Sequence, residues 1–275
     1  MGLLQGITEL FPVSSLGHSV LFPTLFGWTN LVQAQSDPES FFLAFLVGLH
    51  LATALALVVF YWRDWVRIAV GFFTSLRRRR VQTPDERLAW LLIVATLPTA
   101  LIAVFLEHSV RTLFARPLYA SVFLVANGLI LLLTERVAAR RQGTGVALES
   151  VKFAQAGAIG VVQTASLLAG ISRSGIAFVG GLLSGLNHQA AARFSFLLAT
   201  PIILLAGVYK VPDLIGPNGD GVRGQILVGS LAAGVAAYFS VRFLDKYFAK
   251  RRTTPYAWYC IVFGALMAAK LLWLP

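Results

Sequence analysis

Apolar residues fill most of the chain, in runs that are long enough to cross a lipid bilayer as helices. A spanning helix needs roughly 20 apolar residues in succession, and six runs with few charges approach that length. These predicted spans cover residues 41–62, 88–106, 118–134, 194–211, 225–241 and 256–273. Polar residues collect between the runs, so the pattern predicts an all-α integral membrane protein with six transmembrane helices.

Two further apolar segments, residues 1–26 and 154–186, are interrupted at their centres by Gly, Pro and Ser. Such residues break a helix, and irregular backbone inside a membrane is tolerated only where protein or a wet cavity satisfies it. Each segment is therefore predicted to form a re-entrant helix pair that enters the membrane, turns and leaves on the same side.

The centres of the two broken segments resemble each other. The stretch "QGITELFPVSSLGH" at residues 5–18 aligns without gaps with "QTASLLAGISRSGI" at residues 163–176. Each copy precedes three predicted spans, so residues 1–137 and 138–275 read as two repeats within one membrane domain. Because three crossings is an odd number, the second repeat is expected to have inverted topology, an arrangement whose sites lie near the membrane midplane.

Composition supports a membrane protein and argues against nucleic acid as a partner. The chain is 57% hydrophobic and only 13% charged, whereas soluble proteins carry about 25% charged residues. The net charge of +11 comes mainly from three loops that hold seven, four and five Lys or Arg: 63–87, 136–153 and 242–255. The other loops hold at most two, so the positive-inside rule predicts that the rich loops are cytoplasmic and both termini lie outside.

Only one acid and one base lie deep within apolar segments. Of the 12 acidic residues, Glu9 alone is inside such a segment and away from its ends, and Arg173 is the matching cation. Ionisable groups within a membrane are costly, usually paired and commonly functional. A purely structural ion pair between the two helix pairs is the alternative. His50, within the first span, is expected to be a packed polar residue that faces the hairpins, with a proton relay as the alternative.

The second copy of the motif has the composition of an anion site. In "GISRSG", Ser172 and Ser174 flank Arg173, Gly175 follows, and an apolar helix is predicted to begin there. Helix N-termini bind anions through free backbone N–H groups, and Arg binds phosphate oxygens through two parallel hydrogen bonds. The alternative is that the serines and glycines only form a turn and a helix cap.

The first copy has the composition of a catalytic site. Ser14 or Ser15 can cap the helix that follows, and Ser15 and His18 are spaced to share a helix face. A hydroxyl beside an imidazole is typical of an activated nucleophile, although a lone buried histidine is commonly structural. Gln5 and Glu9 also share a face, and their oxygens could hold a hard cation together with substrate phosphates.

These motifs resemble those of the undecaprenyl pyrophosphate phosphatases, a family of integral membrane enzymes also called bacitracin-resistance proteins. The first family motif reads here as Gln5, Glu9 and "PVSSLGH" at 12–18, and the second reads as "AGISRSGIA" at 169–177. The segments "VVFYWRDW" and "FSFLLATP" also look like the family, and the similarity covers essentially the whole chain. Three positions depart from the family pattern: Gln5, Ala169 and Ala177.

The resemblance implies hydrolysis of undecaprenyl pyrophosphate to undecaprenyl phosphate and inorganic phosphate. Undecaprenyl phosphate is the lipid carrier for peptidoglycan precursors, and its recycling by this family confers bacitracin resistance. Members are proteins of the bacterial inner membrane whose sites open to the outer face. They depend on a divalent cation, so the resemblance implies Mg²⁺ or Ca²⁺, here with Glu9 and Gln5 as the candidate ligands.

The residues and the resemblance together assign provisional roles. The predicted catalytic residues are Glu9, Ser15, His18 and Arg173, and the predicted pyrophosphate-binding residues are Ser14, Ser172, Arg173, Ser174 and Gly175. Ser15, His18 or water is the nucleophile. The rival class is a transporter or flippase for a polyprenyl phosphate lipid, because inverted repeats with broken helices are also a transporter architecture. The sequence leaves the oligomeric state open, including a homodimer.

Overall fold

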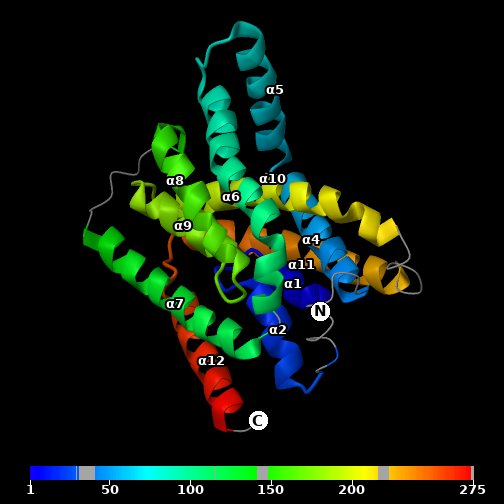
Figure 1. Cartoon of the computed structure of the whole chain (residues 1–275). Coiled ribbons are helices and arrows are strands. Elements are labelled where there is room, and N and C mark those ends of the chain that lie inside the picture. The colour runs from blue at the N-terminus through cyan, green and yellow to red at the C-terminus, as the bar shows by residue number, and fades with distance from the viewer. Residues whose placement is uncertain (29, 31–40, 115, 141–147, 216–222, 274–275) are drawn as a thin grey trace.

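The computed structural model describes residues 1–28, 30, 41–114, 116–140, 148–215 and 223–273, and every regular element in these ranges is helical (Figure 1). The long helices are α4 (Phe41–Phe60), α6 (Pro84–Phe114), α7 (Pro117–Arg140), α10 (His188–Ile215), α11 (Arg223–Phe248) and α12 (Thr254–Trp273). The shorter elements are α1 (Gly2–Thr8), α2 (Ser15–Leu25), α5 (Trp62–Arg78), η1 (Leu148–Ser150), α8 (Phe153–Gln163), η2 (Thr164–Leu167) and α9 (Arg173–Leu183).

The helices confirm a multi-pass membrane protein. Within the described residues, five helices are long and apolar enough to cross a bilayer: α6, α7, α10, α11 and α12. Helices α4 and α5 pass the same test together, although the chain bends by 85° between them, so the count rises to six when they are taken as one broken span. The six apolar runs of the sequence fall on these elements.

The main departure from the sequence prediction is α5, which occupies most of the segment that we expected to be a charged loop. Val66, Val70 and Phe73 recur at helical spacing and form one exposed apolar side of this helix. On the buried side, the indole N–H of Trp90 in α6 donates to the hydroxyl of Ser75 at 2.9 Å. The many arginines in this segment led us to predict a loop, although its apolar residues recur with helical periodicity.

The two broken segments are each packed against a long helix. Helix α1 lies along α11 and α8 lies along α6, while α7 runs beside α12, and α4 contacts both α10 and α11 (Figure 1). The first segment thus packs on a helix from the second half of the chain, and the second segment packs on a helix from the first half. The division into repeats at residue 137 stays a prediction, and α7 itself continues through that position to Arg140.

Each broken segment is a helix pair with a non-helical centre. We call residues 9–14, between α1 and α2, the first tip, and residues 164–172, between α8 and α9, the second tip. Leu10 and Val13 of the first tip are buried, as are Ala169 and Ile171 of the second tip. Leu10, Val13 and Ala169 belong to the hydrophobic core, and this burial holds the polar groups beside them in place.

Candidate active site at the meeting of two broken helices

A serine caps the helix that follows each tip, at matching positions of the sequence repeat. The hydroxyl of Ser14 accepts a hydrogen bond from the backbone N–H of Gly17 at 3.2 Å, at the start of α2. The hydroxyl of Ser172 accepts from the N–H of Gly175 at 3.0 Å, at the start of α9. Such caps contribute about 1 kcal/mol each. The sequence predicted that Ser14 or Ser15 caps the helix after the first break. The structure confirms a serine cap there and assigns it to Ser14, at the start of α2.

The two tips touch each other directly. The hydroxyl of Ser14 also accepts from the backbone N–H of Gly170 at 3.1 Å. Ser174 donates from its hydroxyl to the carbonyl of Phe11 at 3.1 Å. A Cβ atom on Gly17 would lie only 3.0 Å from the Cα of Gly170, so a side chain there would push the tips apart. The backbones of two segments that are far apart in the sequence are therefore in close contact.

Asn127 of α7 connects both tips to the surrounding bundle. Its amide nitrogen donates to the carbonyl of Pro12 at 2.9 Å, and its amide oxygen accepts from the N–H of Ser172 at 3.0 Å. The side chain is fully buried, and each backbone group that it satisfies would otherwise be costly to bury. The sequence analysis missed Asn127, although a lone amide within an apolar run is a signal that could have indicated it.

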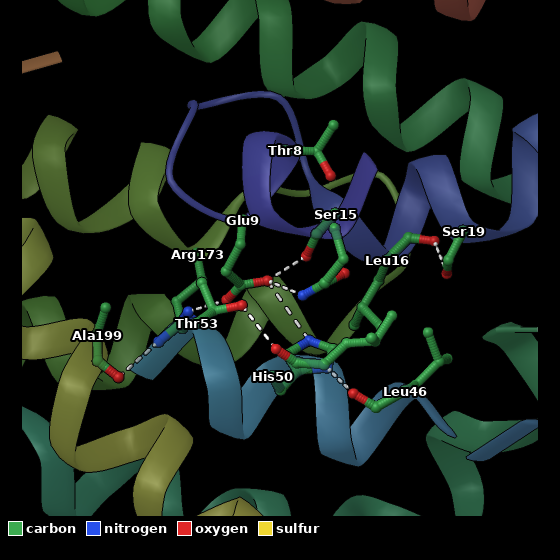
Figure 2. A network of polar contacts seen from close by, with 12 residues as sticks. Thr8, Glu9, Ser15, Leu16, Ser19, Leu46, His50, Thr53, Arg173 and Ala199 are labelled. Carbon is green, nitrogen blue, oxygen red and sulfur yellow. Dashed lines mark hydrogen bonds and ion pairs between the residues drawn. The ribbon is translucent and has the colours of Figure 1, made fainter. Parts of the chain in front are cut away.

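Glu9 is the centre of the polar network in Figure 2, and it is only 6% exposed. Its Oε1 atom accepts a hydrogen bond from Nη2 of Arg173, which forms an ion pair with it. Its Oε2 atom accepts from the hydroxyl of Ser15 and, at 2.9 Å, from the amide nitrogen of Gln5. The structure thus brings together Glu9 and the candidate nucleophile Ser15 from the first copy of the motif and Arg173 from the second copy.

Arg173 is held at both ends of its guanidinium group. While Nη2 pairs with Glu9, Nη1 donates to the carbonyl of Ala199 in α10 at 2.9 Å. The neighbouring hydroxyls of Ser172 and Ser174 lie 3.0 Å from each other. Their contacts here serve the helix cap and the joint between the tips, so a role for these serines in binding pyrophosphate stays a prediction.

His18 does not contact the Ser15 hydroxyl as the sequence predicted. Its Nδ1 atom lies 2.8 Å from the carbonyl of Ser14, so this nitrogen must carry the hydrogen, and its Nε2 atom lies 2.7 Å from the hydroxyl of Tyr259. The imidazole also stacks on the rings of Tyr259 and Phe263 and is only 1% exposed. The structure therefore does not bring the Ser15 hydroxyl and the His18 imidazole into contact, because the helix turn and α12 engage both ring nitrogens, and a catalytic role for His18 stays a prediction.

His50 of α4 takes part in the network from another direction. Its Nδ1 atom donates to the carbonyl of Leu46 at 2.8 Å, and its Nε2 atom lies 3.4 Å from Oε2 of Glu9 (Figure 2). An unprotonated nitrogen and a carboxylate are both acceptors, so this approach is favourable only with a proton between them. The expectation that His50 faces the hairpins is confirmed. Its contact with Glu9 adds His50 to the polar network, although we had expected the side chain only to pack.

The surroundings of Glu9 do not fit a cation held by Glu9 and Gln5. Gln5 presents its amide nitrogen to the carboxylate, and the remaining contacts come from Arg173, Ser15 and His50. Mg²⁺ and Ca²⁺ require several oxygen ligands, whereas these contacts supply hydrogen-bond donors. In the described part of the chain, no three His, Cys, Asp or Glu residues form a group that could hold a metal. Dependence on a divalent cation stays a prediction.

The fold and the site define a class: a multi-pass helical membrane protein with a buried carboxylate, hydroxyl and guanidinium where two broken helices meet. Comparison with known proteins gives the family. The chain matches the family described as "Bacitracin resistance protein BacA" over residues 1–266, and it belongs to that family.

Curated relatives extend the match over nearly the full length of both chains. The chain is 52% identical to "Undecaprenyl-diphosphatase" of Mycolicibacterium paratuberculosis, over 100% of this chain and 95% of that protein. It is 48% identical to "Undecaprenyl-diphosphatase 2" of Frankia alni, over 98% and 96%. It is 43% identical to "Undecaprenyl-diphosphatase" of Acidiphilium cryptum, over 96% and 93%.

Proposed function

We propose that this protein hydrolyses undecaprenyl pyrophosphate to undecaprenyl phosphate and inorganic phosphate. The observation that carries the proposal is the hydrogen bond from the Ser15 hydroxyl to Glu9, whose carboxylate is also paired with Arg173. A hydroxyl beside a base and a guanidinium is what phosphoryl transfer requires, and relatives at about half identity are named undecaprenyl-diphosphatases.

Binding of the substrate changes the partners of Arg173. A pyrophosphate carries more negative charge than a carboxylate and matches the planar guanidinium fork, so it competes with Glu9 for Nη2. The bond from Nη1 to the carbonyl of Ala199 keeps the guanidinium in place during this exchange. The terminal phosphate thus gains a charge partner, and the Glu9 carboxylate, freed from its ion pair, becomes a better proton acceptor.

The released carboxylate then acts as the base for Ser15. The Ser15 oxygen attacks the terminal phosphorus as its proton passes to Glu9, and the bridging P–O bond breaks with its electron pair on undecaprenyl phosphate. Water next attacks the phosphoserine and the P–O bond to Ser15 breaks. Glu9 returns its proton to the serine oxygen, and the departing inorganic phosphate keeps both protons of the water. In this scheme His18 positions the first tip through Ser14. Direct attack by water, with Ser15 as a phosphate contact, is the alternative.

The cellular setting follows from the same proposal. The protein lies in the bacterial inner membrane, with its arginine-rich loops in the cytoplasm and both termini and the site toward the outer face. Its product re-enters peptidoglycan synthesis, and removal of the pyrophosphate form confers bacitracin resistance. No step above uses a metal, and the divalent cation and the homodimer stay predictions.

Purified protein in detergent provides the test. We expect inorganic phosphate to be released from farnesyl or undecaprenyl pyrophosphate, although no transmembrane gradient exists there. Acid quenching followed by mass spectrometry is expected to find phosphate on Ser15. A folded protein that binds the substrate but releases no phosphate, with or without Mg²⁺ or Ca²⁺, would contradict the proposal and support the transporter class. Release without a phosphoserine would support direct attack by water.

A further inference from the structure

A pocket of about 340 Å³ lies between the turn that leads into α10 and the end of α11. Its volume is within the range of small-ligand sites. The polar residues that line it are Asn187, His188, Gln189, Lys250, Arg251 and Arg252. Because α11 ends at Phe248 and α12 begins at Thr254, the pocket lies at the level where two predicted spans leave the membrane.

The pocket is separate from the candidate active site. Arg173 begins α9, whereas the pocket-lining residues 187–189 follow its end at Leu183. The 11 residues of α9 extend about 16 Å at 1.5 Å per residue. The two places are therefore at opposite ends of the same helix, and an inference about the pocket does not depend on the proposed phosphatase activity.

The charge of the pocket is of one sign. Lys250, Arg251 and Arg252 are consecutive and exposed, and none of the described residues that line the pocket is acidic. Lys and Arg are the usual protein partners of phosphate groups, Arg through its fork and Lys as a point charge. A concave surface of this composition attracts an anion.

Glu135 of α7 braces the pocket from behind. Its Oε1 atom accepts from the backbone N–H of Thr253 at 2.7 Å and from the Thr253 hydroxyl at 2.6 Å. Its Oε2 atom lies 2.9 Å from Nε2 of His188. Glu135 is buried and its oxygens are engaged by these partners, so it ties the start of α10 to the start of α12 and fixes both walls. The pocket is therefore held by buried contacts, unlike a group of cations on an unbraced loop.

We propose that this pocket binds a phosphate group, carried by an anionic lipid headgroup or free in solution. Basic pockets between transmembrane helices on the positively charged side of a membrane protein recognise anionic headgroups. The position of Lys250, Arg251 and Arg252 at the end of α11 places them at headgroup level. Asn187 and His188 form the opposite wall and offer further hydrogen-bonding groups.

Native mass spectrometry of the full chain in neutral detergent provides the test. Phosphatidylglycerol is titrated against phosphatidylcholine, and inorganic phosphate is added as a competitor in a separate arm. We expect preferential binding of phosphatidylglycerol, and the triple variant Lys250→Gln, Arg251→Gln, Arg252→Gln to weaken it by roughly tenfold or more. Competition by inorganic phosphate identifies the phosphate alone as the ligand, and its absence identifies the lipid headgroup; both results support an anion pocket.

Two further variants separate the pocket from general surface charge. Arg78→Gln, Arg79→Gln, Arg80→Gln removes the same charge at the end of α5, outside the pocket lining, and is expected to change binding by less than about twofold. Asn187→Asp is nearly isosteric and keeps the acceptor that caps α10 through the N–H of Ala190, at 2.8 Å in the parent. It places a negative charge in the pocket and should weaken binding. Equal losses in both triple variants, or unchanged binding in the pocket triple variant and in Asn187→Asp, would overturn the proposal.

Discussion

The guanidinium of Arg173 and the carboxylate of Glu9 form an ion pair, although 164 residues separate them in the chain. Glu9 lies in the first tip and Arg173 is the first residue of α9, directly after the second tip, so the approach of the two tips brings them together. The pair joins the two copies of the repeated motif into one site. In the proposed reaction, an entering pyrophosphate meets Glu9 and Arg173 in this paired arrangement.

Arg173→Lys is expected to lower the rate of phosphate release by about 10²-fold, the usual cost of losing one placed donor to a developing negative charge. An ammonium group cannot donate to the Ala199 carbonyl and face a phosphate as a planar fork at the same time. The measurement is phosphate release from farnesyl pyrophosphate in detergent. Near-normal release by this variant would contradict the proposed role of Arg173 in holding the pyrophosphate.

Ser15→Ala is expected to lower release by roughly 10³-fold or more, because it removes the atom that attacks phosphorus. Thr24→Val is the matched control on the same helix. It also deletes a hydroxyl, but that hydroxyl donates only to the local Val20 carbonyl at 2.8 Å. Rates for the two variants and the parent are compared at saturating substrate. A small and equal effect in both variants would remove Ser15 from the reaction.

His50→Gln is expected to retain most activity, whereas His50→Leu is expected to lose about tenfold or more in kcat with little change in KM. A glutamine amide can still donate toward Oε2 of Glu9 and keep the carboxylate oriented, but a leucine cannot. Steady-state kinetics of the two variants provide the measurement. Equal losses would show that a hydrogen bond to Glu9 is not what His50 supplies.

Gln5→Glu is expected to make activity more dependent on a divalent cation. It places a second carboxylate where the Gln5 amide now donates to Glu9 at 2.9 Å. Two adjacent carboxylates repel each other and together attract Mg²⁺ or Ca²⁺. Activity should therefore fall in EDTA and recover when either cation is added.

The comparison with Gln155→Glu isolates this effect, since Gln155 is in the first turn of α8 and its side chain accepts from the N–H of Lys152. That variant adds the same charge away from Glu9, and its ratio of activity with cation to activity in EDTA should equal that of the parent. The prediction fails if Gln5→Glu also leaves this ratio unchanged.

Asn127→Leu is expected to destabilise the protein, because it leaves the buried N–H of Ser172 without its partner and leaves the carbonyl of Pro12 only the weak thiol donor of Cys260 at 3.8 Å. Each unsatisfied buried group costs about 1–3 kcal/mol. Thermal unfolding in detergent is the measurement. Thr96→Val is the control: it is also buried, but its hydroxyl donates only to the Leu92 carbonyl in its own helix. Equal unfolding temperatures for the two variants would contradict the role of Asn127 as the link between the tips.

The sequence by itself determined the membrane class, the approximate positions of the six spans and the two helix breaks. Those features depend on local composition: long apolar runs require helices in a membrane, and Pro12 or Gly170 interrupts them. The isolated charges of Glu9 and Arg173 were also readable, because an ionisable group in an apolar run is rarely without a partner. The motif around each of them identified the family.

Only the tertiary structure decided which polar groups meet. Ser15 and His18 share a helix turn, yet the hydroxyl bonds to Glu9 while the imidazole is held by Ser14 and Tyr259. Spacing along a helix fixes which residues share a face, but side-chain rotamers and neighbouring helices choose the partner. Contacts between distant segments, such as those of Asn127 with the two tips, arise from packing that no local pattern records.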